Sequence, residues 1–208
     1  MIRSFRLAGW LAAAAVMAGC SSAPVHYYTL LPPESPAPAG QAAVPFLIEV
    51  LPVGVPAQLD QQSMVVRQGD SGVAVLDTER WSGPLSDEMR TALSSGLSQR
   101  LGVPDIAGLA RPGGQPLLRI KVQVRRLDAW PGREAQMEAG WSMGQADDQA
   151  GSRLVCQGRF RVAAPGSYAE LVQAQQRLVA DLADRIAQDA RLWMASRTGC
   201  GPALPAVN

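Results

Sequence analysis

The chain has 208 residues, 47% of them hydrophobic and 18% charged, which provides material for one packed domain and excludes global disorder. The net charge is +1, and it becomes −1 without residues 1–19, which carry Arg3 and Arg6 but no acidic residue. A nearly neutral chain lacks the basic surface that nucleic acid binding requires, so we expect no nucleic acid partner. His26 is the single histidine, which argues against histidine-based metal sites and catalytic triads.

The first twenty residues have the order of a bacterial lipoprotein signal. Two arginines precede an apolar stretch over residues 7–16, which is too short to span a bilayer comfortably. Residues 17–20 then read Met-Ala-Gly-Cys, with small side chains before a cysteine, as in a lipobox. We predict a signal peptide over residues 1–19 and a diacylglycerol and an acyl chain such as palmitate on Cys20, with no other cofactor. An ordinary secretory signal or an uncleaved anchor is the alternative.

The residue after the lipidated cysteine predicts the destination. In Gram-negative bacteria, aspartate at this place retains a lipoprotein in the inner membrane, whereas serine permits export to the outer membrane. Ser21 occupies this place. Residues 20–24 therefore serve as a lipidated tether, and the protein is expected at the outer membrane, facing the periplasm.

Two further cysteines, Cys156 and Cys200, remain in the mature chain. The periplasm is oxidising, so we expect a disulfide between them. The alternative is one buried thiol and one free thiol in the tail.

The first half of the mature chain predicts short strands and one helix. Strands are expected at residues 25–31 and 46–51, on either side of a proline-rich loop at 32–45. Residues 64–67 and 73–76 predict a hairpin around a glycine-containing loop. A helix should begin near Pro84 and end before Gly102. Its apolar stripe recurs every four positions, at Leu85, Met89, Leu93, Leu97 and Leu101.

The second half predicts a meander and a long helix. Apolar and polar residues alternate from residue 117 to residue 163 in three runs, with a phase slip at residues 126–127 that suggests a bulge. Ser167 and Glu170 form a capping box that opens a helix running to about Met194. The predicted fold is α+β, an antiparallel sheet with two main helices on one face. It forms a single domain over residues 25–198, followed by a tail at 199–208.

The sequence shows no catalytic motif. It lacks a phosphate-binding loop and a nucleophile elbow, and the acidic pair Asp147–Asp148 has the surroundings of an exposed hairpin tip. The row of cations at Arg119, Lys121, Arg125, Arg159 and Arg161 predicts the solvent-exposed face of a sheet, with Glu138 as a cross-strand partner. We therefore expect neither an enzyme nor a metal site. The apolar residues of the hairpin over 64–76 are consistent either with ordinary core or with an exposed apolar surface.

Four segments, in this order, resemble a known family of envelope lipoproteins. They are Tyr27-Tyr28-Thr29-Leu30 after the lipobox, Leu59-Asp60 followed by residues 64–67, Arg80-Trp81 with Pro84-Leu85, and residues 168–172 with Ala174-Gln175. Together they cover nearly the whole mature chain and resemble the PqiC/YmbA-type auxiliary lipoproteins of ABC-linked transporters.

The resemblance implies a non-enzymatic, outer-membrane subunit of an MCE-type intermembrane lipid transport system that supports membrane integrity. Its partners would be the MCE-domain tunnel protein, outer-membrane lipid and further copies of itself in a homo-oligomer. The resemblance assigns a structural role to four residues, with Trp81 filling the junction of sheet and helix. The four are Tyr27, Tyr28, Trp81 and Pro84. A pilot or assembly lipoprotein that anchors another envelope or secretion machine is the alternative function.

Overall fold

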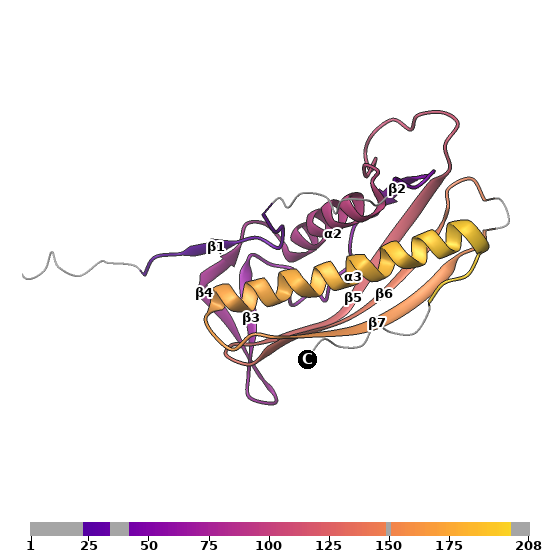
Figure 1. Cartoon of the computed structure of the whole chain (residues 1–208). Helices are drawn as coiled ribbons and strands as arrows, with labels where there is room; N and C mark the ends of the chain where they lie inside the picture. The colour runs from indigo at the N-terminus through magenta and orange to yellow at the C-terminus, as the bar shows by residue number, and fades with distance from the viewer. Residues whose placement is uncertain (1–22, 34–41, 149–150, 201–208) are drawn as a thin grey trace, which may run out of the picture.

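The computed structural model describes residues 23–33, 42–148 and 151–200. The predicted signal peptide, Cys20, residues 34–41 of the proline-rich loop and residues 201–208 of the tail lie outside the described residues. The described chain contains two helices and two sheets, which confirms the predicted α+β class (Figure 1).

The larger sheet has four strands in the order β2 (Leu47–Val50), β5 (Leu117–Trp130), β6 (Glu134–Gln145) and β7 (Leu154–Ala163). Strands β5, β6 and β7 form the predicted antiparallel meander, and a register shift lies between Val124 and Arg126, next to the expected bulge. Strand β2 instead adds parallel to β5, with Ile48 opposite Leu118. The sheet is therefore mixed, which corrects the expectation of purely antiparallel pairing.

A second, smaller sheet has the order β1 (His26–Tyr28), β4 (Gly72–Trp81) and β3 (Ser63–Gln68). Strands β3 and β4 form the predicted hairpin, but its connection is shorter than expected because Gln68 pairs with Gly72. Strand β1 runs parallel to β4, with Tyr28 opposite Trp81. Parallel partners are joined by long connections, so the alternation of residues along one strand does not reveal them.

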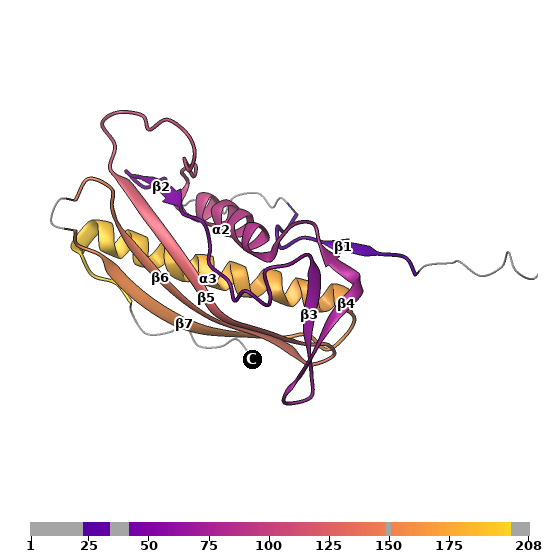
Figure 2. The ribbon, with the colours of Figure 1, turned by 180° about the vertical axis from the view of Figure 1, so that it is seen from behind.

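Both helices lie on the same side of the four-stranded sheet (Figures 1 and 2). Helix α2 (Leu85–Leu101) buries the whole predicted apolar stripe, follows an extended Pro84 and ends at Gly102, whose φ of 68° favours glycine. Helix α3 (Tyr168–Ser196) begins at the predicted capping box of Ser167 and Glu170 and continues two residues beyond Met194. A 29-residue helix is about 43 Å long, so α3 spans the domain.

The domain has two distinct ends (Figure 1). Strand β1, the hairpin of β3 and β4, and the start of α3 lie at one end, which we call the anchor end because Cys20 precedes β1. The loop between α2 and β5, the connection between β6 and β7, and the end of α3 lie at the opposite end. One large apolar core runs between the helices and the sheets.

Candidate interaction surfaces

At the anchor end, a buried carboxylate holds β1 in place. The Tyr28 hydroxyl donates a hydrogen bond to Glu79 Oε2 at 2.7 Å, and His26 Nδ1 lies 3.0 Å from Glu79 Oε1. Glu79 belongs to β4 and is only 7% exposed. The burial of Glu79 was not expected from the sequence, because a glutamate in an alternating strand predicts a solvent-facing position.

The pKa values of Tyr28 and Glu79 both shift in the direction that favours their hydrogen bond. Burial raises the pKa of Tyr28 to about 12, and the neighbouring Glu79 carboxylate acts in the same direction. Burial also acts to raise the pKa of Glu79, but the hydrogen bonds from Tyr28 and His26 outweigh it and lower that pKa from its ordinary value. At neutral pH the pair is a phenol donating to a carboxylate, which joins β1 to β4.

The predicted structural motif divides between core and surface. Trp81 is 2% exposed and packs beside Leu85, directly after the N-cap residue Pro84. Tyr28 is half-buried against Glu79, whereas Tyr27 is 62% exposed. Tyr27 therefore contributes side-chain surface at the anchor end and does not belong to the core.

Two acidic side chains form hydrogen bonds that join α2 to neighbouring segments of the chain. Glu88 Oε2 accepts hydrogen bonds from the Thr29 hydroxyl at 2.7 Å and from the Leu30 backbone N–H at 2.8 Å. Asp60 Oδ1 accepts from the Ser86 backbone N–H at 3.0 Å, which satisfies a free donor in the first turn of α2. Helix α2 is thereby fixed to the segment that follows β1.

A groove of about 190 Å³ separates the hairpin of β3 and β4 from the second half of β5. We call it the hairpin groove. Its exposed apolar wall carries Val73 and Val75, which are 58% and 52% exposed, whereas Met64 and Val66 of the same hairpin are buried. The hairpin therefore contributes to the core on one side and to an apolar surface on the other. Its remaining lining residues are Pro56, Gln58, Leu59, Val65, Val66, Arg67, Arg125, Arg126, Leu127, Asp128 and Ala129.

A small inner cavity of about 10 Å³ adjoins the hairpin groove, and four residues line both: Leu59, Val65, Leu127 and Ala129. Its other lining residues are Trp81, Leu85 and Gln175 of α3. Gln175 is 2% exposed, and its amide nitrogen Nε2 has no hydrogen-bond partner among the described residues. A buried donor without a partner is unfavourable, and the indole Nε1 of Trp193 is a second such donor among the described residues.

The rim of the hairpin groove is positively charged. Arg67 Nε lies 2.5 Å from Asp128 Oδ1, and Arg126 pairs with the other oxygen of the same buried carboxylate. Arg125 has no ion pair within the described part of the chain. Three guanidinium groups against one carboxylate leave a local excess of positive charge.

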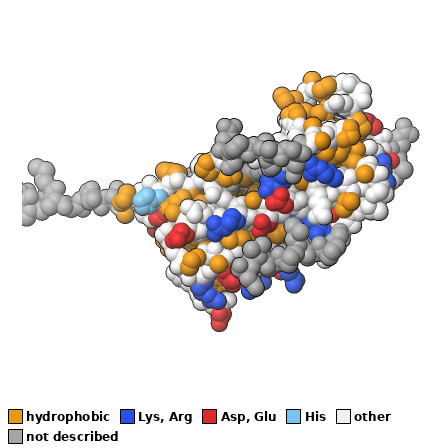
Figure 3. All heavy atoms as spheres, in the orientation of Figure 1, with side chains coloured by type: hydrophobic (Ala, Val, Ile, Leu, Met, Phe, Trp, Pro, Cys, Tyr) orange, Lys and Arg blue, Asp and Glu red, His pale blue; other side chains and the backbone are white. Residues whose placement is uncertain are grey.

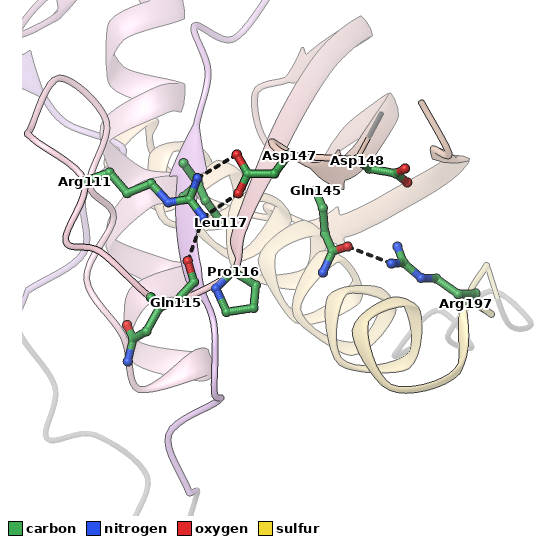
Figure 4. Close-up of a pocket in the computed structure, with 9 residues that line it drawn as sticks. Arg111, Gln115, Pro116, Leu117, Gln145, Asp147, Asp148 and Arg197 are labelled. Carbon is green, nitrogen blue, oxygen red and sulfur yellow. Dashed lines mark hydrogen bonds and ion pairs between the residues drawn. The ribbon is translucent and has the colours of Figure 1, made fainter. Parts of the chain in front are cut away.

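The opposite end of the domain carries a wider, more open hollow of about 730 Å³ (Figure 4). Arg111 pairs with Asp147 at 2.6 Å, and Arg197 donates to Gln145 Oε1 at 2.6 Å. The hydrogen bond from Arg111 lowers the pKa of Asp147, so this exposed carboxylate is charged and paired. The arrangement is that of an ion-paired surface loop, in line with the expectation for the hairpin tip.

Three of the five cations on the exposed face of the meander are paired, whereas Lys121 and Arg125 have no ion pair within the described residues. Glu138 lies opposite Arg159 across the strands with a contact of 2.9 Å, which confirms the predicted partner. Arg161 pairs with Glu134, and Arg119 pairs with Glu49 at 2.6 Å. Such exposed pairs each contribute at most about 1 kcal/mol to stability.

In the structure Cys156 and Cys200 form a disulfide, with Cα atoms 5.6 Å apart. Asp189 lies beside them and accepts hydrogen bonds from the Cys200 backbone N–H at 2.7 Å and from Trp141 Nε1 at 3.1 Å. Cys156, Asp189 and Cys200 are the one group with metal-ligand spacing in residues 23–33, 42–148 and 151–200, and the disulfide uses both sulfurs.

Within the same residues, no helix is long and apolar enough to cross a bilayer.

A family model described as "ABC-type transport auxiliary lipoprotein component" matches residues 28–187. Among solved structures, an uncharacterised protein covers 81% of this chain and 99% of its own, with 18% identity and a TM-score of 0.63. A Xanthomonas campestris protein described as DUF330 covers 83% of this chain and 100% of its own, with 16% identity and a TM-score of 0.59. At these identities the two structures show a shared fold. A search among curated proteins finds no match.

Proposed function

Because the chain belongs to the family of ABC-type transport auxiliary lipoprotein components, we propose that it is the outer-membrane lipoprotein subunit of an MCE-type intermembrane lipid transport system. It docks the periplasmic tunnel protein of that system and supports membrane integrity. It acts as a homo-oligomer, and its role is docking without catalysis.

The hairpin groove is the observation that carries this proposal. Val73 and Val75 expose apolar side chains beside the arginines of the rim, and a groove with an apolar wall and a charged rim is typical of a protein interface. The hairpin that forms one wall of the groove lies at the anchor end (Figure 1). His26 is the sixth residue after Cys20, so the two Cα atoms are at most about 21 Å apart. The lipid anchor therefore keeps the groove near the membrane, where the end of a periplasmic tunnel must dock.

The test is recovery of the partner from native envelopes. The lipidated protein is extracted in mild detergent after chemical crosslinking, and the proteins recovered with it are identified by mass spectrometry. The proposal predicts an MCE-domain protein, with recovery reduced by Val75→Asp in the groove and unchanged by Val155→Asp, which changes a more exposed valine on β7. Recovery of secretin or outer-membrane assembly subunits instead would assign the pilot or assembly role.

A further inference from the structure

We propose that the hairpin groove and the inner cavity together form a receptor for a tyrosine side chain of the partner protein, flanked by a carboxylate. This rests on the proposed function and specifies the chemistry of its docking site. Three features of the described residues carry it: the size of the groove, the unpartnered amide of Gln175, and the charge at the rim.

The size of the groove suits one aromatic ring. A buried apolar cavity of about 150 Å³ accommodates benzene in a protein core. The hairpin groove holds about 190 Å³ between Val73 and Val75 on one side and Leu127 on the other. The strands also exclude a larger occupant, because β3 and β5 contact each other and leave no room for an added strand between them. A single anchoring side chain inserted from outside is the occupant that fits.

The amide of Gln175 selects a side chain with an oxygen at its far end. Six of the seven residues around the inner cavity are apolar, so a water molecule there would find too few hydrogen-bond partners. A phenol hydroxyl that enters past Leu59 and Leu127 would accept a hydrogen bond from Gln175 Nε2 and satisfy it. A phenylalanine would leave this donor unpaired, and an acyl chain would place its methyl end against it.

The rim selects the residues next to the tyrosine. Arg67 and Arg126 already share Asp128, whereas Arg125 has no ion pair within the described residues and is one of the residues that line the groove. A carboxylate on the partner, next to the inserted ring, would pair with Arg125. Tyrosine is among the side chains that most often carry the binding energy of an interface, which agrees with a single anchor of this kind.

Short peptides test the receptor directly. The mature lipidated protein is incorporated in lipid nanodiscs, and binding is measured by calorimetry or NMR for the acetylated, amidated peptides Asp-Tyr-Asp, Asp-Phe-Asp and Asn-Tyr-Asn. The proposal predicts that Asp-Tyr-Asp binds about tenfold more tightly than Asp-Phe-Asp, since the phenylalanine leaves one buried donor unsatisfied. It also predicts weaker binding of Asn-Tyr-Asn than of Asp-Tyr-Asp.

Two variants assign these differences to named residues. Gln175→Met keeps the length of the side chain and should abolish the preference for tyrosine while the phenylalanine peptide still binds. Arg125→Gln should abolish the preference for aspartate over asparagine. Equal binding of the tyrosine and phenylalanine peptides to the unsubstituted protein would overturn the inference. Tighter binding of dodecanoate, strengthened by Gln175→Met, would also overturn it and assign the groove to an acyl chain.

The failure of this inference can be told from the failure of the proposed function. If the MCE-domain protein is recovered from envelopes but the peptides show no preference for tyrosine, the receptor is wrong and the function stands. If the preference depends on Gln175 while no MCE-domain protein is recovered, the receptor is supported and the assigned partner is wrong.

Discussion

The Tyr28 hydroxyl on β1 donates a 2.7 Å hydrogen bond to Oε2 of Glu79 on β4. This contact fixes a parallel strand that pairs with its neighbour β4 over only three residues. It joins the segment that follows Cys20 to the sheet that carries the hairpin groove. The position of the groove relative to the lipid anchor therefore depends on a buried carboxylate.

The role of Glu79 predicts a specific dependence of stability on pH. Folding lowers the pKa of this carboxyl, so its contribution to the free energy of unfolding is complete above its ordinary pKa of 4.5 and is lost as the pH falls through the lowered value in the folded protein. Urea denaturation between pH 7 and pH 3 measures this. We expect Glu79→Gln to be less stable than the unsubstituted protein at pH 7, with the difference narrowing as the pH falls below 4.5. A constant difference over the whole range would contradict this role.

Trp81 should be a major source of stability. It is 2% exposed at the junction of β4, α2 and α3, so Trp81→Ala leaves a large cavity and should lower the free energy of unfolding by about 3–5 kcal/mol. Tyr27→Ala is the matched control, because Tyr27 is exposed and its loss should change stability by less than about 0.5 kcal/mol. Chemical denaturation of both variants checks the prediction, and a Trp81→Ala variant that melts like the unsubstituted protein would refute it.

The two cysteines of the mature domain should be oxidised in the protein purified from envelopes. Alkylation without reduction, followed by mass spectrometry, should find neither Cys156 nor Cys200 modified. The bond closes a separation of 44 residues, and in the chain-entropy account its removal in a Cys156→Ala, Cys200→Ala variant costs up to about 4 kcal/mol. A free thiol at either position would show that the alternative arrangement holds.

Sorting of the lipoprotein should depend on Ser21. The substitution Ser21→Asp leaves the lipidated cysteine intact and should move the protein from the outer-membrane fraction to the inner-membrane fraction of a density gradient. Cys20→Ala should remove the lipid attachment, so it reports whether anchoring depends on that residue. Recovery of the unsubstituted protein in the inner-membrane fraction would contradict the assigned location.

The sequence predicted the parts of the fold that depend on local patterns. The apolar stripe of α2, the capping box of α3 and the alternation of the meander are local patterns. Each formed as expected because the secondary-structure propensity of the segment agrees with its pattern of buried positions. The two parallel pairings were missed, since β1 and β2 find partners more than fifty residues away. Glu79 was missed for the same reason, because its burial depends on His26 and Tyr28 arriving from β1.

The candidate site was only partly visible in the sequence. The apolar hairpin and the segment Ala174-Gln175 both stood out, but neither pattern places Gln175 next to Leu59 and Trp81. That contact is formed by a loop, a strand and a helix that are distant in the chain. Figure 3 shows orange apolar side chains and charged side chains interspersed over the face of the molecule that Figure 1 presents.

Site-specific photo-crosslinking tests the central claim most directly. A photoreactive amino acid replaces Val75 in the hairpin groove or, as the control, Val155 on β7, in the lipidated protein in living cells. The account predicts that position 75 crosslinks to an MCE-domain protein and that position 155 does not. A crosslink from position 75 to a secretion or assembly subunit, or equal crosslinking of the MCE-domain protein from both positions, would contradict it.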